Sequence, residues 1–471
     1  MLFPTLNFGL FFLVVFFAAW LAARWPEFRV WLLIAASYFF YAFWDWRFMA
    51  LLFGSSALNY LGGKAIHRLA DPRARKLALI ATVALNLGVL GIFKYFNFFA
   101  DSLNTLLFAL GSSREVPYLD VALPVGISFF TFHGISYVAD LYRGALSRPA
   151  PFAHLMLYIS FFPQLVAGPI VRASFFLPQI AARPDPQSIA TTRAFLLIVC
   201  GLFKKVVLAN YLATDLVDGA FFDPTSLGAA DLLLAIYGYA LQIYCDFSAY
   251  TDIAIGVAAL LGIRFPQNFN QPYRALGLQD FWRRWHISLS TWLRDYLYIF
   301  ALGGDTGDRR LYRNLMVTML LGGLWHGARW TFVTWGALHG FALVIERAIR
   351  ERFRDRPHLG PLARIVATVA TFHFVCLTWV FFRAPDFEHA FLYLEGFTRL
   401  SAPITLASPF VLLLVFGTLA AQFLPVDRVE RLEALLARAP MLLQGALLGL
   451  AIATIDSFGP AGVAPFIYFQ F

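Results

Sequence analysis

The chain has 471 residues, of which 60% are hydrophobic and only 14% are charged, and its mean hydropathy is +0.67. A soluble domain is closer to half apolar and a quarter charged, so this composition excludes an ordinary soluble enzyme and indicates a protein embedded in a lipid bilayer. The formal net charge of +9 comes from basic residues that border apolar segments, and this distribution argues against nucleic acid as a partner.

Apolar segments long enough for membrane helices recur along the whole chain. A spanning helix needs roughly 20 mostly apolar residues. The clear candidates are Phe8–Ala23, Val30–Tyr41, Leu77–Phe93, Leu232–Tyr244, Ile365–Phe382, Phe410–Leu424 and Leu442–Ile455. Weaker candidates, which carry a charge or a glycine or proline break, are Phe48–Leu61, Leu155–Val166, Phe195–Leu212 and Leu315–Phe341. We therefore expect an all-α polytopic membrane protein with about 10–12 spans, together with re-entrant or interfacial helices.

Clusters of Lys and Arg predict the orientation of these spans, because such clusters favour the cytoplasmic side. They lie at Arg24–Arg29, Lys64–Lys76, Arg347–Arg364 and Arg428–Arg438. Two spans separate the first two clusters, so both are predicted to be cytoplasmic and the N-terminus to be outside. Phe8–Ala23 lacks the charged start and cleavage site of a secretory signal, and we expect it to be retained as the first span.

No long linker or internal repeat divides the chain, and we expect one membrane-embedded domain over residues 1–471. Ionisable side chains gather between Tyr239 and Gly340, inside a site-bearing core at about residues 120–345. Charged groups at membrane depth are costly and usually face a cavity or the protein interior, so this block is where a site is expected. The three cysteines lie in separate apolar segments without metal-ligand spacing, and no metal site is predicted.

The segment LLGGLWHGARWTFVTWGALHG carries the first candidate, His326. Read as one helix, it places Arg329 and Trp330 on the same face as His326. His339 is then rotated by roughly 220° and points elsewhere. The segment contains no Asp or Glu, so a carboxylate partner for His326 must come from another part of the chain. An interior hydrogen-bonded histidine and a catalytic histidine both remain open.

The segment DFWRRWHISLSTWLRDYLYI carries the second candidate, His286. Its alternating Trp and Arg residues are typical of a helix at the lipid headgroup interface. An interfacial anchor explains His286 less well than it explains the other residues, so His286 is a possible second contact to a substrate.

The segment YCDFSAYTD places Asp246 and Tyr250 on one helical face and adds Asp252 one turn further on. A proton pathway, an ion site and a structural polar network are all open for these residues. Lys204 and Lys205, in a nearby apolar segment, are expected to extend to an interface. The chain lacks the motifs GxxxxGK[ST], GxGxxG, HExxH, CxxC and GxSxG, which disfavours ATP-driven transport, zinc proteolysis and serine-elbow hydrolysis.

Several blocks together resemble the membrane-bound O-acyltransferase (MBOAT) family, in its bacterial branch that acetylates alginate, peptidoglycan and related polysaccharides. The matching blocks are Leu32–Trp44, Leu123–Gly144, Phe161–Arg172, Ala240–Tyr273, Asp280–Ile299 and Gly322–Gly340. The resemblance implies helices around a central tunnel, with His326 as the active-site histidine and His286 as a second catalytic position. The chain departs from the alginate pattern at two places. It has His133 in place of Gln, and it has FALGG in place of PLGG at Phe300–Gly304. These departures weaken the assignment of alginate as the glycan and leave the predicted chemistry unchanged.

The resemblance also implies a reaction, which is acetyl transfer from a cytoplasmic thioester such as acetyl-CoA to an extracytoplasmic polysaccharide. No cofactor is expected to stay bound. His326 would be the general base, and Arg283 and Arg284 would meet the phosphates of CoA. The tunnel and substrate residues are predicted to be Trp325, Arg329, Trp330, Asp246 and Tyr250.

The chain has no soluble hydrolase domain of the SGNH type, so a separate periplasmic SGNH protein is expected to accept the acetyl group. The predicted location is the inner membrane of a bacterium. Two other functions remain open: acylation of a lipid or protein by another branch of the family, and a proton- or ion-coupled transporter. The transporter would use Asp246, Asp252 and His326, and it would move its substrate without consuming thioester.

Overall fold

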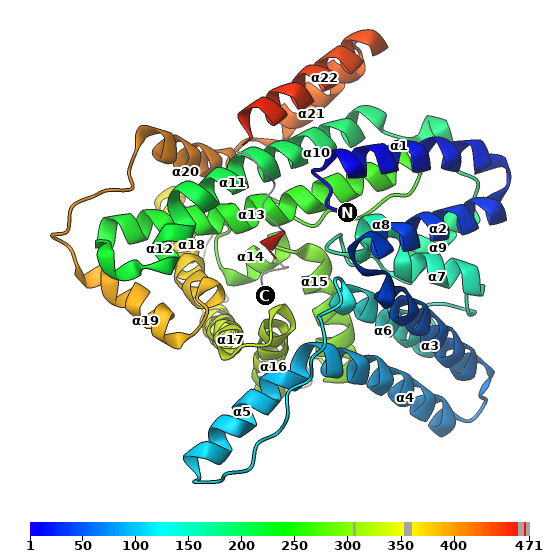
Figure 1. Cartoon of the computed structure of the whole chain (residues 1–471), viewed down its shortest axis with the longest axis horizontal. Helices are drawn as coiled ribbons and strands as arrows, with labels where there is room; N and C mark the ends of the chain where they lie inside the picture. The colour runs from blue at the N-terminus through cyan, green and yellow to red at the C-terminus, as the bar shows by residue number, and fades with distance from the viewer. Residues whose placement is uncertain (305–307, 353–359, 460–465, 468–471) are drawn as a thin grey trace. The chain divides into compact units, whose positions relative to one another are not determined.

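The computed structural model describes residues 1–304, 308–352, 360–459 and 466–467 (Figure 1). These residues form helices and connecting segments without a strand, which confirms the all-α prediction. They divide into two compact units. Unit 1 comprises Met1–Ala190 and Val257–Pro266, and unit 2 comprises Thr191–Gly256 and Gln267–Phe471. Part of the basic cluster Arg347–Arg364, residues 353–359, lies outside the described residues.

Unit 1 consists of the first nine α-helices. They are α1 (Leu6–Leu21), α2 (Pro26–Asp45), α3 (Met49–Arg68), α4 (Pro72–Leu90), α5 (Phe96–Ala109), α6 (Ile127–Arg143), α7 (Phe152–Ser160), α8 (Phe162–Leu165) and α9 (Ala173–Ala181). Phenylalanine rings fill the space between α1, α2 and α8, where Phe40 lies 6.1 Å from Phe8 and 5.7 Å from Phe162 between ring centroids. His133, on the buried helix α6, contacts the Tyr158 ring at 5.2 Å.

Unit 2 contains the ionisable residues singled out in the sequence. Its helices are α10 (Thr191–Phe203), α11 (Asn210–Leu212), α12 (Asp218–Phe222), α13 (Ala229–Leu260), α14 (Leu278–Arg284), α15 (Ile287–Trp292), α16 (Asp308–His326), α17 (Trp330–Arg352), α18 (Pro361–Arg383), α19 (Phe387–Glu395), α20 (Pro409–Ala421), α21 (Val426–Ala437) and α22 (Met441–Phe458). The apolar window of α13 is 83% buried, whereas that of α22 is 6% buried. Helix α13 is therefore an interior helix, and its polar side chains face protein.

Seven helices in the described residues are long and apolar enough to cross a membrane, or up to eight if the bent pair α20 and α21 forms one span. They lie at Leu6–Arg24, Pro72–Ala109, Thr191–Phe222, Ala229–Leu260, Trp330–Arg352, Pro361–Arg383 and Met441–Phe458. The number is smaller than the ten to twelve expected. Val30–Tyr41 and Phe48–Leu61 form the helices α2 and α3, which are not among the candidate spans, and Leu155–Val166 is divided between α7 and α8. Leu315–Phe341 is divided between α16 and α17, of which only α17 is a candidate span.

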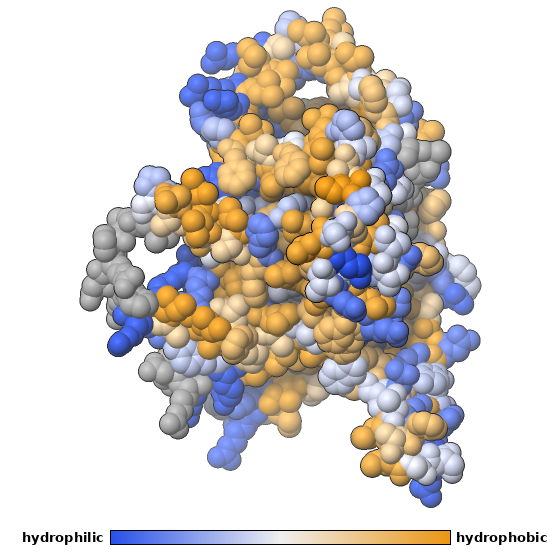
Figure 2. Space-filling view, turned by 90° about the vertical axis from the view of Figure 1, so that its left-hand side faces the viewer, coloured by the Kyte–Doolittle hydropathy of each residue, from blue (hydrophilic) through white to orange (hydrophobic). Residues whose placement is uncertain are grey.

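The exterior of the protein suits a lipid environment. Large hydrophobic side chains are exposed along α1, α20 and α22, including Leu6 (78%), Leu413 (69%) and Leu442 (90%). Figure 2 shows that apolar residues cover much of one face of the molecule. Exposed apolar surface on this scale marks a site of contact with lipid or protein, and with the spans it supports a multi-pass membrane protein.

The feature that positions the site is a hairpin formed by α16 and α17, which lie side by side (Figure 1). Gly323 and Gly336 face each other across it. A Cβ atom on Gly323 would collide with the backbone oxygen of Phe332, and one on Gly336 with that of Met319. Because neither glycine carries a side chain, the two backbones approach closely and the helix reverses within three residues after His326.

Candidate functional site

His326 is the last residue of α16 and lies at the tip of the hairpin. Its side chain is buried, with a residue exposure of 4%. Within the described part of the chain, the rings of Trp325, Trp335 and Phe382 contact the imidazole, each with its centroid 5.1 Å away. These rings come from α16, α17 and α18, so three helices of unit 2 build one apolar chamber around His326.

His286 lies in a break between α14 and α15, outside the candidate spans, with no exposed surface. Its backbone is left-handed, with φ of 43°, a conformation that is uncommon outside glycine. Two backbone hydrogen bonds hold the break, from the amide of Asn270 to the oxygen of Arg284 and from the amide of Ile287 to the oxygen of Asn268, both 2.9 Å long. The break therefore has a defined geometry, and the predicted single helix over this segment is wrong.

The hydrogen bonds of His286 determine its tautomer. The Asn268 side-chain oxygen accepts the Ser288 backbone N–H at 3.0 Å, which identifies this atom as the oxygen. The same oxygen lies 3.2 Å from His286 Nδ1, so Nδ1–H donates to it and Nε2 carries the lone pair. The buried Nε2 has no hydrogen-bond partner in the described parts of the chain. Burial also lowers the pKa of His286 to about 3, so the imidazole is neutral near pH 7.

Trp325 links the two histidines. Its ring centroid lies 6.1 Å from that of His286 and 5.1 Å from that of His326. The structure thus brings together two candidates that are 40 residues apart in the sequence, both in contact with a single indole. Phe247 of α13 covers the other side of His286, with centroids 4.6 Å apart.

The turn after His326 changes the predicted places of its neighbours. Trp330 begins α17 and is 52% exposed, so it does not share a helical face with His326. Arg329 lies in the turn with its guanidinium 5.4 Å from the Phe332 ring centroid. His339, expected to point elsewhere, lies 4.7 Å from the Trp335 ring, which in turn contacts His326. A continuous helix forbids this arrangement, whereas a hairpin folds α17 back over α16.

Asp246 and Tyr250 both contact the chain's C-terminal segment. Asp246 forms an ion pair with Lys205 at 2.6 Å and accepts the Ile467 backbone N–H at 2.7 Å. The Tyr250 ring packs against Phe466 at 4.9 Å.

The two lysines near α13 are ion-paired inside unit 2. Lys204 pairs with Asp252 at 2.6 Å, and Lys205 pairs with Asp246. The expectation that they extend to an interface is therefore wrong. Both carboxylates instead offset a buried positive charge, which favours the structural polar network among the alternatives left open by the sequence.

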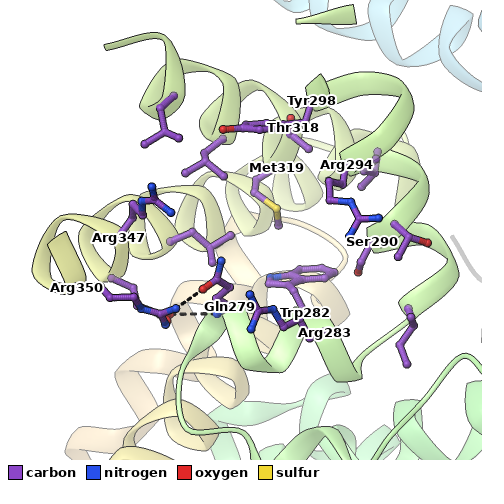
Figure 3. A pocket seen from close by; sticks show the side chains of 17 residues that line it. Gln279, Trp282, Arg283, Ser290, Arg294, Tyr298, Thr318, Met319, Arg347 and Arg350 are labelled. Atoms are coloured by element: carbon purple, nitrogen blue, oxygen red, sulfur yellow. Dashed lines mark hydrogen bonds and ion pairs between the residues drawn. The ribbon is translucent and has the colours of Figure 1, made fainter. Parts of the chain in front are cut away.

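A cavity of 430 Å³ beside the hairpin carries most of the positive charge around the site; we refer to it as the arginine pocket (Figure 3). Arg283, Arg294, Arg347 and Arg350 line it, together with one acidic residue, Glu346. Glu346 bonds to Arg350 and accepts the backbone N–H of Leu278 at 2.7 Å. Arg294 also pairs with Asp295 and Arg347 with Glu351, so the pocket combines guanidinium groups with carboxylates that partly neutralise them. Guanidinium groups are suited to binding an anion.

Of the two arginines predicted to meet a donor, only Arg283 lines the arginine pocket. Arg284 turns away and pairs with Asp280 at 2.8 Å. Figure 3 shows Arg283 beside Trp282, and the Trp282 ring connects the pocket with the chamber. Its centroid lies 5.7 Å from that of Trp335, which contacts His326. Two indole rings therefore separate the arginine pocket from the His326 imidazole.

Sequence reasoning missed Asn268, Trp335, Arg294 in the π-helical segment η9 (Leu293–Ala301), and the arginines of α17. Asn268 precedes His286 by 18 residues and meets it only because the chain between them folds back. Arg347 and Arg350 are one turn apart at the basic end of α17, a signal that indicates a cytoplasmic loop and gives no sign of a pocket.

Comparisons with known proteins identify the family of the chain. The model of the MBOAT, membrane-bound O-acyltransferase family, matches residues 114–383. A peptidoglycan O-acetyltransferase of Helicobacter pylori is 39% identical over 399 residues, which are 79% of this chain and 74% of that protein. A probable alginate O-acetylase of Pseudomonas aeruginosa is 42% identical, over 84% of this chain and 74% of that protein.

A teichoic acid D-alanyltransferase of Bacillus subtilis is 30% identical, over 56% of this chain and 70% of that protein. The matched family region contains both histidines, the hairpin and the start of every helix that surrounds His326. The chain therefore belongs to the membrane-bound O-acyltransferase family and is a multi-pass O-acyltransferase.

Proposed function

We propose that the chain transfers an acetyl group from a cytoplasmic thioester, acetyl-CoA or an equivalent acyl thioester, to an extracytoplasmic polysaccharide. The observation that carries the proposal is the pair of buried imidazoles of His286 and His326, which both contact the Trp325 ring. The names of the relatives support the acceptor, since they act on peptidoglycan, alginate or teichoic acid.

In the proposed reaction, His326 is the general base. Its neutral ring takes the proton from the acceptor hydroxyl while the oxygen attacks the thioester carbonyl. The tetrahedral intermediate collapses with cleavage of the carbon–sulfur bond, and the imidazolium returns the proton to the leaving thiolate. Positioned proton transfer of this kind contributes roughly 10²–10⁴-fold to the rate.

His286 is proposed to hold the donor in place. Its Nδ1–H is committed to Asn268, so Nε2 only accepts a hydrogen bond. The amide N–H groups of a pantetheine arm are donors of the required kind. His286 would then contact the donor, and its loss is expected to raise the KM for the thioester more than it lowers kcat.

The arginine pocket is proposed to bind the phosphates of the donor. Arg283 is the predicted donor residue that lines it, and Arg294, Arg347 and Arg350 add three further guanidinium groups. Trp282 and Trp335 lie between this pocket and His326, where an acyl arm would have to pass. Trp325 belongs to the proposed substrate path, while Arg284 has no place in it, since it pairs with Asp280.

The proposed setting is the inner membrane of a bacterium, with residues 1–471 acting as one catalytic domain and the N-terminus on the periplasmic side. The final acceptor would receive the acetyl group through a periplasmic SGNH-type partner. The arrangement of the described residues gives less support to the transporter alternative, because Asp246 and Asp252 are each ion-paired with a lysine.

The proposal is tested with the purified protein and labelled acetyl-CoA, by measuring the release of CoA and the label on a glycan or partner protein. His326→Ala is expected to reduce turnover by about 10²-fold or more. His67→Gln, a change of an exposed histidine at the end of α3, is the matched control and leaves turnover unchanged. Full turnover in a folded His326→Ala protein would contradict the assignment of the base.

A further inference from the structure

A polar network at the edge of the arginine pocket ties α14 to α17. Glu346 of α17 uses one oxygen, Oε2, to accept two backbone N–H groups at the start of α14, that of Leu278 at 2.7 Å and that of Gln279 at 3.1 Å. Its other oxygen, Oε1, accepts a hydrogen bond from Arg350. Arg350 also donates to the side-chain oxygen of Gln279, as Figure 3 shows. The start of α14 is therefore held by both side chains of α17.

The carboxylate of Glu346 lies directly against the backbone that precedes α14. Gly277 is the residue before this helix, and a Cβ atom on it would lie 2.9 Å from Glu346 Oε1 and 3.1 Å from the carboxyl carbon. Non-bonded carbon atoms prefer separations of about 3.5–4.0 Å, so even a methyl group at Gly277 would displace the carboxylate. The contact can therefore be disturbed from either helix.

The position of α14 determines where two side chains of the proposed donor path lie. The helix has only seven residues, Leu278–Arg284, and a helix this short depends on tertiary contacts for its stability. It carries Arg283, which lines the arginine pocket. It also carries Trp282, whose ring centroid lies 5.7 Å from that of Trp335 and 5.4 Å from that of His339. A shift at the start of α14 would move both the guanidinium and the indole.

Arg283 is the arginine of this pocket that gains most from a bound anion. Arg294, Arg347 and Arg350 each pair with a carboxylate. Arg283 is exposed and forms no ion pair within the part of the chain that the structure describes. A guanidinium that is already paired gains less from a phosphate, because part of its charge is already offset. The affinity of the pocket for an anion therefore depends on where α14 places Arg283.

Glu346 affects an anion in this pocket in two ways, and the two effects have opposite signs. As a negative charge it repels the anion, so its removal would strengthen binding. As the acceptor for α14 it fixes Arg283, so its removal would weaken binding. The repulsion is small, because Glu346 is paired with Arg350, whose side chain is 55% exposed. A hydrogen bond from Arg283 to a phosphate is charge-assisted and stronger, so the second effect dominates.

We propose that Glu346 is a positioning residue for the acyl donor, which holds the start of α14 so that Arg283 and Trp282 stand in the donor path. The inference rests on the proposed function, because it presupposes that the arginine pocket binds the donor. Glu346 acts through Arg283, and the hydrogen bonds to α14 carry its role, whereas its charge does not.

The test measures the Kd of CoA by calorimetry, together with KM and kcat for acetyl-CoA, on the purified full chain. Glu346→Leu removes the acceptor, and we expect both Kd and KM to rise about tenfold with less than about a threefold change in kcat. Glu346→Gln keeps an oxygen for the two backbone N–H groups and removes the charge, so Kd should stay the same or fall. Gly277→Ala displaces the carboxylate without changing it, and its Kd should rise as in Glu346→Leu.

A double variant tests whether Glu346 acts through Arg283. Arg283→Gln alone should raise the Kd of CoA about tenfold or more. In that background, Glu346→Leu should add less than about a threefold change, because no guanidinium is left to position. Glu430→Leu, at an exposed glutamate of α21 outside the arginine pocket, is the matched control and leaves Kd unchanged. Thermal stability of each variant is measured in parallel.

The outcomes separate this inference from the proposed function. If Arg283→Gln binds CoA as the unmodified chain does, the proposed donor site is wrong. If Arg283→Gln weakens binding but Glu346→Leu and Gly277→Ala do not, the donor site stands and the positioning role is overturned. Tighter binding of CoA by Glu346→Leu would also overturn it, since Glu346 would then act only as a negative charge. Equal loss of binding in Glu346→Gln and Glu346→Leu would do the same, because the acceptor oxygen would then have no part.

Discussion

The protonation state of His286 is fixed by neighbours and not by the histidine itself. Asn268 presents one oxygen to two donors, the Ser288 backbone N–H and His286 Nδ1–H. The left-handed backbone at His286 costs on the order of 1–3 kcal/mol, and the surrounding hydrogen bonds keep it in place. Strain that is maintained by specific partners is typical of functional positions, and here it accompanies a buried Nε2 without a hydrogen-bond partner in the described residues.

Replacing Asn268 tests this arrangement. Asn268→Leu removes the acceptor and leaves the Ser288 N–H without a partner, and we expect turnover to fall roughly tenfold or more with a cost of about 1–3 kcal/mol in stability. Asn268→Asp keeps an acceptor but adds a negative charge, which raises the pKa of His286. Activity that needs neutral His286 is lost as pH falls through that pKa.

At high pH the Asp variant should therefore be nearly as active as the unmodified chain. On acidification, the variant should lose activity at a higher pH than the unmodified chain does. The measurement is the pH dependence of thioester turnover. Identical profiles for Asn268→Asp and the unmodified chain would show that the His286–Asn268 bond has no part in the reaction.

At the scale of elements, the hairpin of α16 and α17 decides which residues meet His326. The sequence segment is apolar and helical throughout, and a single span is the simplest prediction from it. The structure has two antiparallel helices, because Gly323 and Gly336 permit their backbones to touch. The reversal brings Trp335 to the histidine, with His339 on the far end of the same contact, and leaves Trp330 half-exposed at the start of α17.

Adding a methyl group at the contact should open the hairpin. Gly336→Ala places a Cβ against the Met319 backbone oxygen, which cannot move without shifting α16. Overpacking typically costs about 1–3 kcal/mol, and the displacement of α16 should also reduce turnover. Gly322→Ala is the matched control, since its Cβ would lie 3.4 Å from a Leu293 methyl group, an ordinary contact. The measurements are the thermal stability and the thioester turnover of both variants. Equal stability of the two variants would contradict the predicted role of the Gly336 contact.

The ion pair between α13 and the π-helical segment Lys204–Ala209 gives a second test at this scale. Lys205→Met leaves Asp246 buried and unpaired, with an expected cost of roughly 3–5 kcal/mol. The double variant Lys205→Met, Asp246→Leu removes both charges and should recover most of that stability.

Turnover of the double variant then distinguishes the two roles of Asp246. Recovery of activity together with stability identifies a structural pair. Stable protein without activity would instead support the sequence-based prediction that Asp246 takes part in the substrate path.

At the scale of the whole molecule, the orientation in the membrane remains a prediction from the basic clusters. It is tested in a variant whose three cysteines are replaced by serine, by adding one cysteine and labelling intact cells with a membrane-impermeant maleimide. Leu2→Cys should react in intact cells, because the N-terminus is predicted to be outside. Arg73→Cys, in the cytoplasmic cluster Lys64–Lys76, should react only after the membrane is opened. The reverse pattern would refute the predicted orientation.

Much of the fold was predictable because its signals are local. Span positions follow from apolar runs, and His326 and His286 stand out as ionisable groups in apolar or interfacial segments. What could not be predicted depends on contacts across the chain: the helix breaks at His286 and after His326, the pairing of Asn268 with His286, and the lysines that neutralise Asp246 and Asp252. The resemblance to the family identified both histidines, and only the structure shows the indole that contacts both.

The aromatic layer around His326 also bears on the permeability of the membrane. Trp282 and Trp335 connect the arginine pocket with His326, and Phe382 contacts both Trp335 and the imidazole. These rings pack at centroid distances of 5.1–5.7 Å, and closely packed rings oppose the passage of water and ions. In the proposed reaction, only the small acyl group has to pass this layer, while each of its large hydrophilic carriers stays in its own aqueous compartment. Such an enzyme would exchange a chemical group between two compartments and still preserve the electrochemical gradient that separates them.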